Sequence, residues 1–263
     1  MLLLHPFLLS QSVWKRVAPQ LAETGRYEVF APTMLAHNGA PRGPLFLDSG
    51  SLADHVEHQM DQLGWRTAHI VGNSLGGWVA FELERRGRAR TLTAIAPAGG
   101  WTRYAPGKFE TIFKFVVGFP VWLAARVLGP RALSLPMSRQ LAYPLISASP
   151  DGISETDLID IIDDVAHCPG YYQLLVKTLV LPGLLELAET RAPTHLVVCE
   201  KDRVFPPPRF STHFTTYLPK NTRMTTLDGV GHVPMFEAPE RISELILEFV
   251  DQYAGPEARR TGS

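Results

Sequence analysis

The chain alternates short, fully apolar runs with longer amphipathic stretches. The apolar runs predict strands that are buried on both faces. They cover residues 2–4, 27–30, 68–71, 91–95 and 196–199, with a weaker sixth at 223–227. The amphipathic stretches predict helices at residues 14–24, 51–63, 75–86, 210–217 and 239–253. This alternation predicts an α/β fold with a mostly parallel sheet of about six strands flanked by helices.

The alternation breaks between residues 99 and 190, where proline and glycine interrupt a helical periodicity and no strand is predicted. We interpret this region as a helical cap inserted into a core that comprises residues 1–98 and 191–254. Ser154 and Asp157 have the spacing of a capping box, which would open a helix running to His167. We expect most apolar side chains of the insertion to pack against the core, the alternative being that some line an apolar pocket. Residues 255–263 are polar and are expected to be disordered.

Composition excludes several classes of partner. The 25 basic and 26 acidic residues of this 263-residue chain give a net charge of -1, which leaves no overall field to recruit a nucleic acid or an anionic membrane. The two cysteines, Cys168 and Cys199, indicate neither a disulfide framework nor a structural metal site, so a cytoplasmic location is expected. The longest charge-free apolar stretch, residues 115–125, is shorter than the about 20 residues of a spanning helix, so no integral membrane span is expected. These features leave the oligomeric state open.

One motif has a specific chemical meaning. Residues 72–77 read Gly-Asn-Ser-Leu-Gly-Gly, a G-x-S-x-G pattern between a predicted strand and a predicted helix. A turn of this kind forces the serine into a strained backbone conformation, and glycines let neighbouring segments pass closely. Ser74 would then lie at the carboxyl edge of the sheet, where the Leu75 N–H can donate to a developing oxyanion. The competing interpretation is a glycine-rich turn with an idle serine.

A serine hydroxyl becomes a nucleophile only beside a base, and the base must be oriented by a third group. Asp202 follows the fifth predicted strand and so lies at the same edge of the sheet. His232 lies in a glycine-bearing loop after the last strand. Glu200 is an alternative acid, because it lies nearer the end of its strand. His69 and His195, within or beside predicted strands, are expected to be structural.

With these three segments, in the chain order Ser, Asp, His, the sequence resembles the serine-nucleophile α/β-hydrolase superfamily, in its cap-bearing esterase and lipase-like branch. The resemblance covers essentially the whole chain. It implies that Ser74 is the nucleophile, that His232 is the general base and then the general acid, and that Asp202 orients the histidine.

Three features depart from the family pattern. The family's His-Gly turn corresponds to Leu4-His5-Pro6-Phe7, which implies Phe7 as the second oxyanion N–H although Pro6 replaces the glycine. Residues 33–38 keep only the histidine of a second family loop, so His37 is expected to be structural. Relatives carry an antiparallel strand pair before the strand on which this chain begins. Either the sheet is shortened or the natural start lies upstream.

The resemblance implies hydrolysis by acyl transfer to water, without a cofactor or a metal ion, and the expected substrate is a small or medium apolar carboxylic ester. Epoxide hydrolases and haloalkane dehalogenases of this fold use an aspartate where Ser74 stands, so both chemistries are excluded on this argument. A carbon–carbon bond hydrolase or a lactonase with the same triad is the alternative enzyme, and a ligand-binding protein that reuses the fold is the non-catalytic alternative. Trp101 and Arg103 are further candidates to face the substrate, with a surface ion pair as the other interpretation of Arg103.

Overall fold

The computed structural model describes residues 1–253, except 45, 103, 136–139, 141–142, 150–151, 181–182 and 185. Within these residues five strands form one parallel sheet in the order β1-β2-β3-β4-β5. The strands are β1 (Leu2–Leu4), β2 (Ala68–Asn73), β3 (Ala89–Ile95), β4 (Thr194–Cys199) and β5 (Arg223–Leu227). The predicted α/β fold with a parallel sheet is therefore confirmed. The tail at 255–263 lies outside the described residues.

The apolar run at 27–30 contributes a single bridge instead of the strand that its sequence predicts, so the sheet has five strands and not about six. Phe30 pairs with Leu2, donates its N–H to the Met1 carbonyl at 2.8 Å and accepts the N–H of Leu3 at 2.9 Å. The next rung would need the N–H of residue 32, which is a proline and has none. β1 therefore lies between the segment at Phe30 and β2. The chain adds the Phe30 segment on one side of β1 and all later strands on the other side, so the direction of the strand order reverses at β1. Open α/β sheets bind ligands at the carboxyl ends of strands at such a reversal.

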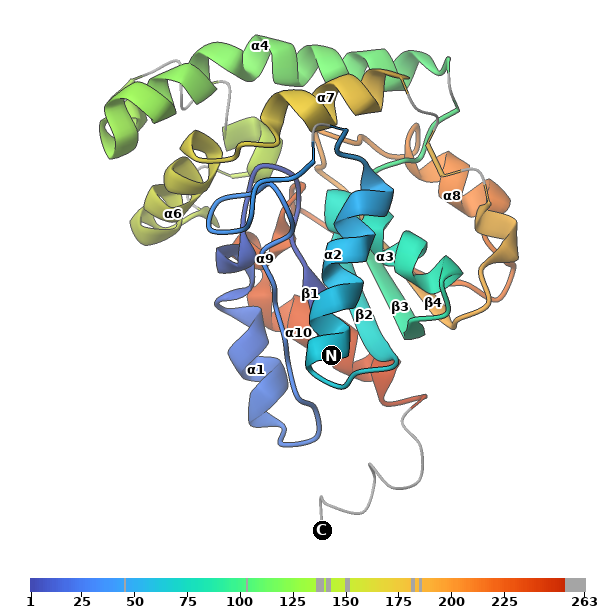
Figure 1. The fold of residues 1–263 in the computed structure, drawn as a ribbon. Coiled ribbons are helices and arrows are strands. Elements are labelled where there is room, and N and C mark those ends of the chain that lie inside the picture. The colour runs from blue at the N-terminus through green and yellow to red at the C-terminus, as the bar shows by residue number, and fades with distance from the viewer. Residues whose placement is uncertain are drawn as a thin grey trace.

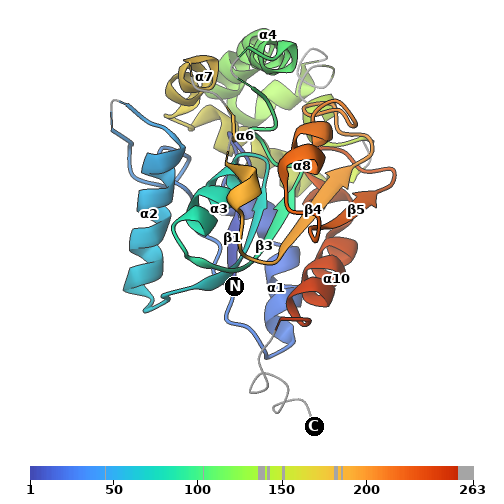
Figure 2. The same cartoon turned by 90° about the vertical axis from the view of Figure 1, so that its right-hand side faces the viewer.

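Helices cover both faces of the sheet (Figures 1 and 2). Side chains such as Leu3 and Val71 point into the layer of α1 (Val17–Glu23) and α10 (Pro239–Val250), together with η1 (Gln11–Trp14) and α9 (Pro234–Glu237). Their neighbours along the strands, such as Leu4 and Ile70, point into the layer of α2 (Ser49–Gln62), α3 (Leu75–Arg85) and α8 (Ser211–Tyr217). Burial on both faces explains why the strands lack the polar alternation of a half-exposed sheet.

The region between β3 and β4 is helical where it is described. Its helices are α4 (Pro106–Leu128), η2 (Gly129–Ser134), α6 (Glu155–Ala166), α7 (Tyr171–Val180) and η4 (Leu187–Glu189). α4, α6 and α7 lie together beyond one end of the sheet, with α4 outermost (Figure 1). The predicted capping box is present at the start of α6, where the Ser154 side chain accepts the N–H of Asp157 and the Asp157 carboxylate accepts the N–H of Ser154.

α4 is packed differently from what the sequence led us to expect. Only one side of this helix is buried, through residues such as Thr111 and Ala125. On the other side Phe113 is 65% exposed, and Phe109 and Val116 are also exposed. These three side chains are exceptions to the expectation that most apolar side chains of the insertion pack against the core. The reason is the position of α4 at the edge of the molecule, which leaves its outer side without a neighbour (Figure 1). By length and composition alone, the segment Pro106–Ala132 could also cross a membrane, whereas no such segment was expected.

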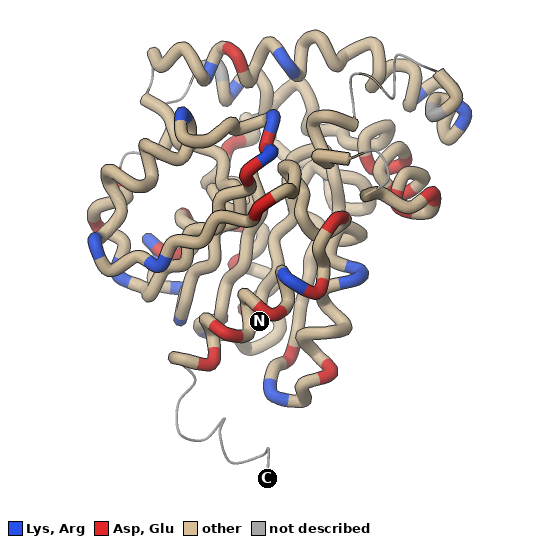
Figure 3. Tube along the Cα trace, turned by 180° about the vertical axis from the view of Figure 1, so that it is seen from behind, with Lys and Arg blue, Asp and Glu red and all other residues tan. Residues whose placement is uncertain are grey.

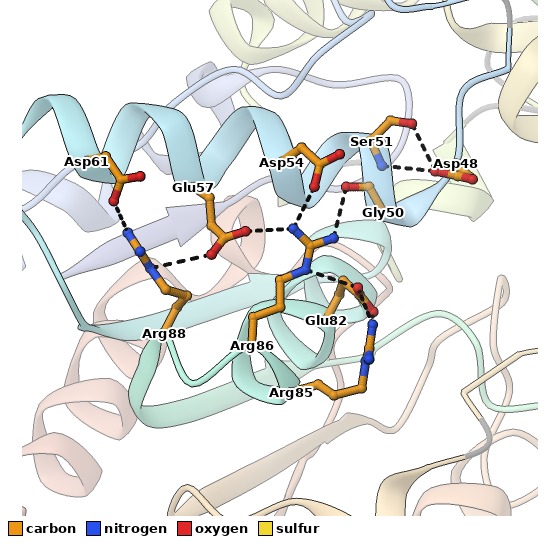
Figure 4. A network of polar contacts seen from close by, with 10 residues as sticks. All are labelled: Asp48, Gly50, Ser51, Asp54, Glu57, Asp61, Glu82, Arg85, Arg86 and Arg88. Atoms are coloured by element: carbon orange, nitrogen blue, oxygen red, sulfur yellow. Dashed lines mark hydrogen bonds and ion pairs between the residues drawn. The ribbon is translucent and has the colours of Figure 1, made fainter.

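Arg86, at the end of α3, joins this helix to α2 (Figure 4). Its guanidinium donates to Asp54 and Glu57 of α2 at 2.6 Å each, and to Glu82 of its own helix at 3.1 Å. Arg88 extends the network by binding Asp61. The guanidinium of Arg86 is thus surrounded by three carboxylates from two helices.

We expect Arg86→Ala to lower the free energy of unfolding by about 1–2 kcal/mol, because it removes charge-assisted hydrogen bonds from the partly buried carboxylates of Glu57 and Glu82. Urea denaturation measures this change. Arg85→Ala is the matched control: the Arg85 side chain is 54% exposed, and we expect a loss below about 0.5 kcal/mol. Equal losses in the two variants would contradict this role for the network.

Three histidines are buried in the fold as the sequence predicts. Burial lowers the pKa of His37, His69 and His195 to about 4 in each case. His69 and His195 each share a hydrogen bond with a threonine hydroxyl, that of Thr91 at 3.0 Å and that of Thr225 at 2.8 Å. These side chains are therefore structural imidazoles held neutral near pH 7.

The buried histidines predict acid sensitivity. Below a pH of about 6.5 these histidines bind protons in the unfolded chain but stay neutral in the folded chain. The free energy of unfolding therefore falls as the pH drops from about 6.5 to about 4. Urea denaturation across this range measures the slope. His195→Gln should reduce the slope, whereas His58→Gln, at an exposed position of α2, should leave it unchanged. Identical slopes in His195→Gln and the parent protein would refute the explanation.

Candidate active site

Ser74 lies in the turn between β2 and α3, with φ 55° and ψ -115°. A residue with a side chain rarely adopts positive φ, and the strain persists only where the surroundings impose it. Here the Ser74 N–H donates to the Ile95 carbonyl at 3.0 Å, and the Ser74 carbonyl accepts the N–H groups of Trp78 at 3.1 Å and Ala98 at 2.9 Å. These bonds fix the serine at the carboxyl end of β2.

The glycines of the motif are required by close backbone contacts. A Cβ at Gly72 would lie 2.2 Å from the Gly76 carbonyl oxygen, and one at Gly76 would lie 2.3 Å from the Leu4 carbonyl oxygen. Both distances are far below a van der Waals contact. The turn that carries Ser74 is thereby pressed against the end of β1.

Asp202 and His232 form a buried hydrogen-bonded pair. The distance from Asp202 Oδ2 to His232 Nδ1 is 2.7 Å. Asp202 Oδ1 accepts the N–H groups of Val204 and Phe205, both at 2.8 Å, so both carboxylate oxygens have partners. The Phe205 ring packs edge-on against the imidazole at 5.1 Å between centroids. Because Nδ1 is engaged by the carboxylate, Nε2 is the atom of a neutral His232 that can accept a proton.

The alternative acid, Glu200, is engaged elsewhere. Its Oε2 accepts the N–H of Gly229 at 2.8 Å, and its Oε1 accepts from Lys201 Nζ at 2.9 Å. Glu200 is 42% exposed in its side chain, whereas that of Asp202 is 2% exposed. The structure brings Asp202, and not Glu200, to the imidazole.

Two polar residues to which sequence reasoning gave no role hold the histidine loop in place. Asn73 Nδ2 donates to the His232 carbonyl at 3.1 Å and to the Ile95 carbonyl at 3.0 Å. Glu237 accepts the N–H of Gly231 at 2.7 Å and that of Ala148 at 2.9 Å. In the sequence, a polar asparagine between an apolar strand and the motif serine was the signal that could have identified Asn73. Glu237, which joins the loop to the region between β3 and β4, carries no local sequence signal.

Ser74 and His232 line the same cavity, which has a volume of about 100 Å³. A second chamber of about 60 Å³ shares Ser74, Phe7 and Phe115 with the first. The lining is mostly apolar and includes Leu8, Leu9, Val121, Trp122, Ile146, Val165 and Val233. A more open groove of about 760 Å³ runs along α3 and η4 but contains neither Ser74 nor His232. The chemistry that these two residues offer is therefore confined to the apolar cavity.

The two predicted oxyanion donors lie beside Ser74, because Phe7 and Leu75 both line the second chamber with it. His5 orients the peptide group that carries the Phe7 N–H. His5 Nε2 accepts the N–H of Met34 at 2.8 Å, so the ring proton is on Nδ1, which donates to the Pro6 carbonyl at 2.8 Å. The Pro6 carbonyl and the Phe7 N–H belong to one peptide plane. Burial lowers the pKa of His5 well below its ordinary value, which keeps this arrangement in a single protonation state.

Trp101, Arg103 and His37 are the remaining residues that the sequence singles out. Trp101 is buried and lines the second chamber with Ser74. Arg103 lies outside the described residues. His37 packs edge-on against His5 at 4.8 Å and shares neither chamber with Ser74. Within the part of the chain that is described, no group of three or more His, Cys, Asp or Glu side chains could hold a metal ion.

Comparison with known proteins identifies the family to which the chain belongs. The profile of the "Alpha/beta hydrolase family" matches residues 1–245, so the chain belongs to that family of hydrolases. The chain is 66% identical over 206 residues to a protein of Mycobacterium tuberculosis named epoxide hydrolase EphH, an alignment that covers 78% of this chain and 96% of that one. It is 27% identical over 260 residues to the putative carbamate hydrolase RutD of Azorhizobium caulinodans, covering 93% and 90%. A thermophilic esterase from Thermogutta terrifontis has the same fold, with a TM-score of 0.75 and 21% identity over 96% of this chain and 89% of that one.

Proposed function

We propose that the protein hydrolyses small or medium carboxylic esters with apolar groups, and that Ser74 carries the acyl group between the two halves of the reaction. The observation that carries the proposal is the shared cavity: Ser74 and the His232 ring both line it, and the ring is bonded to the buried Asp202 carboxylate at 2.7 Å. The apolar lining suits an uncharged substrate.

In the first half of the proposed reaction, Ser74 Oγ attacks the ester carbonyl and His232 Nε2 takes its proton. Asp202 stabilises the imidazolium that forms. The N–H groups of Leu75 and Phe7 donate to the tetrahedral oxyanion. When the intermediate collapses, the imidazolium gives its proton to the departing alkoxide, which leaves as the alcohol.

In the second half, His232 takes a proton from water, and the hydroxide adds to the carbonyl of the acyl group on Ser74. Collapse of this intermediate returns the proton to Ser74 Oγ and releases the carboxylic acid. One ester and one water thus become one acid and one alcohol. A lactonase falls within the same scheme because a lactone is a cyclic ester. A carbon–carbon bond hydrolase and a non-catalytic binding protein are alternatives that no observation on the molecule favours.

Epoxide hydrolysis is a second candidate, and the 66% identity to a protein named an epoxide hydrolase favours it. Attack of Ser74 on an epoxide carbon would form an ether, which has no carbonyl to which water can add. A serine enzyme could turn over an epoxide only if His232 activated water for direct attack on the ring. A serine at position 74 rules out the route through an aspartate ester, but it does not rule out direct attack of water on the epoxide ring.

Assays of p-nitrophenyl butyrate and styrene oxide, with the parent protein and Ser74→Ala, distinguish the two functions. We expect the parent protein to hydrolyse the ester, and the variant to lose that activity. Turnover of styrene oxide that survives in Ser74→Ala, without turnover of the ester by the parent protein, would overturn the proposal in favour of direct water attack.

A further inference from the structure

α4 and α7 lie side by side at the outside of the molecule (Figures 1 and 2). Both helices expose apolar side chains. The rings of Trp122 and Tyr172 pack against each other at 5.6 Å, which joins the two helices. We call the surface formed by Phe113, Val116, Leu123, Val127, Tyr172 and Val176 the outer cap face. Phe113 is 65% exposed and Val127 is 70% exposed. Exposed apolar side chains that gather on neighbouring helices are typical of an interaction site.

The same helices form a wall of the cavity that holds Ser74. Phe115 and Trp122 of α4 and Tyr171 of α7 line that cavity. The outer cap face is therefore separated from the cavity by about the 10 Å thickness of one helix. A partner on this face lies close to the site that binds the apolar substrate.

The charges of the outermost elements of the insertion indicate which partner fits. α6, which lies beneath α4, is acidic, and two of its five carboxylates, those of Asp157 and Asp160, are paired with basic side chains of the core. α4, η2 and α7 carry five basic residues, Lys108, Lys114, Arg126, Arg131 and Lys177, and all except Lys108 are at least partly exposed. Their one acidic residue, Glu110, is bound in ion pairs with Lys114 and Arg209. Figure 3 shows blue positions along α4, the outermost helix.

This local excess of positive charge is hidden in the net charge of -1, which led us to expect no attraction to an anionic surface. Two copies of the chain docked through this face would place like charges together, at an electrostatic cost. An anionic lipid surface instead complements the basic residues and accepts the apolar side chains.

We propose that the outer cap face docks on an anionic lipid surface, with α4 and α7 lying in the plane of the interface. Phe113 and Val127 enter the apolar layer, and Arg131 and Lys177 contact the headgroups. An apolar molecule dissolved in the lipid is thereby brought close to Ser74. Binding to lipid requires no catalysis, so it is measured independently of the proposed ester hydrolysis.

Co-sedimentation with vesicles tests the proposal. The protein should bind vesicles of phosphatidylcholine mixed with phosphatidylglycerol more tightly than vesicles of phosphatidylcholine alone, and salt should weaken the binding. Phe113→Ser with Val127→Ser should lower the affinity at least about tenfold, because it removes two apolar anchors. Arg131→Glu with Lys177→Glu should abolish the preference for phosphatidylglycerol. Hydrolysis of a dissolved ester by these variants should equal that of the parent protein.

Met224→Ser with Tyr217→Ser is the matched control, since these side chains are 48% and 47% exposed on the sheet and on α8. This control should bind vesicles as the parent protein does. Absence of binding by the parent protein, or an equal loss in the control, would overturn the proposal. So would a dimer in sedimentation equilibrium that Phe113→Ser with Val127→Ser dissociates, because a second copy would then occupy the face.

Discussion

Ser74→Ala should reduce kcat for p-nitrophenyl butyrate by about 10⁴-fold or more, because the variant has no oxygen to accept the acyl group. What remains is the activity of a site that binds the ester and offers the N–H groups of Leu75 and Phe7 to the oxyanion. An assay of released p-nitrophenol over a long incubation measures the residual rate. KM should change far less than kcat, since the cavity lining is intact.

The fold of the Ser74→Ala variant should survive, because alanine occupies the same backbone conformation without a larger side chain. Ser211→Ala, at the start of α8 and outside both chambers, is the matched control and should retain full activity. Ser74→Gly should be more stable than the parent protein, since glycine adopts φ 55° without strain. Ester turnover by Ser74→Ala at the parent rate would contradict the assignment of the nucleophile.

Asp202→Asn should also reduce kcat by about 10⁴-fold, because it favours the wrong tautomer of His232. Oδ1 accepts two backbone N–H groups at 2.8 Å, from Val204 and Phe205, so the side-chain oxygen of the variant keeps that position. The new amide nitrogen then faces His232 Nδ1 and donates to it. The ring proton moves to Nε2, which can no longer take the proton of Ser74.

Glu200→Gln is the control for the acid, because Glu200 is a carboxylate at the end of the same strand. We expect Glu200→Gln to retain activity within a few-fold of the parent protein. A larger loss in Glu200→Gln than in Asp202→Asn would reverse the assignment of the acid. Steady-state rates of both variants on one ester measure the difference.

The parts of the fold that the sequence predicts are those with local signals. The G-x-S-x-G pattern predicts the turn at Ser74, since the close contacts at Gly72 and Gly76 leave no room for a side chain. The capping box at Ser154 is likewise local. The α/β fold and the α/β-hydrolase family are both confirmed. The roles of Ser74, Asp202 and His232 stay predictions.

The parts that sequence reasoning missed depend on tertiary neighbours. The run ending at Phe30 has the composition of a strand, but its pairing stops because Pro32 has no N–H to offer β1. The apolar side chains of α4 were expected to pack in the core, because hydrophobic periodicity does not show which side of a helix lacks a neighbour. Asn73 and Glu237 bind backbone groups that are distant in sequence, so their partners became visible only in the fold.

The central claim, that Ser74 is the nucleophile, is tested most directly by covalent trapping. The protein is incubated with a fluorophosphonate, digested, and mapped by mass spectrometry. We expect one adduct, on the peptide that contains Ser74, with labelling greatly slowed in Asp202→Asn and absent in Ser74→Ala. An unlabelled Ser74, or an adduct on another residue while ester turnover is lost, would contradict the claim.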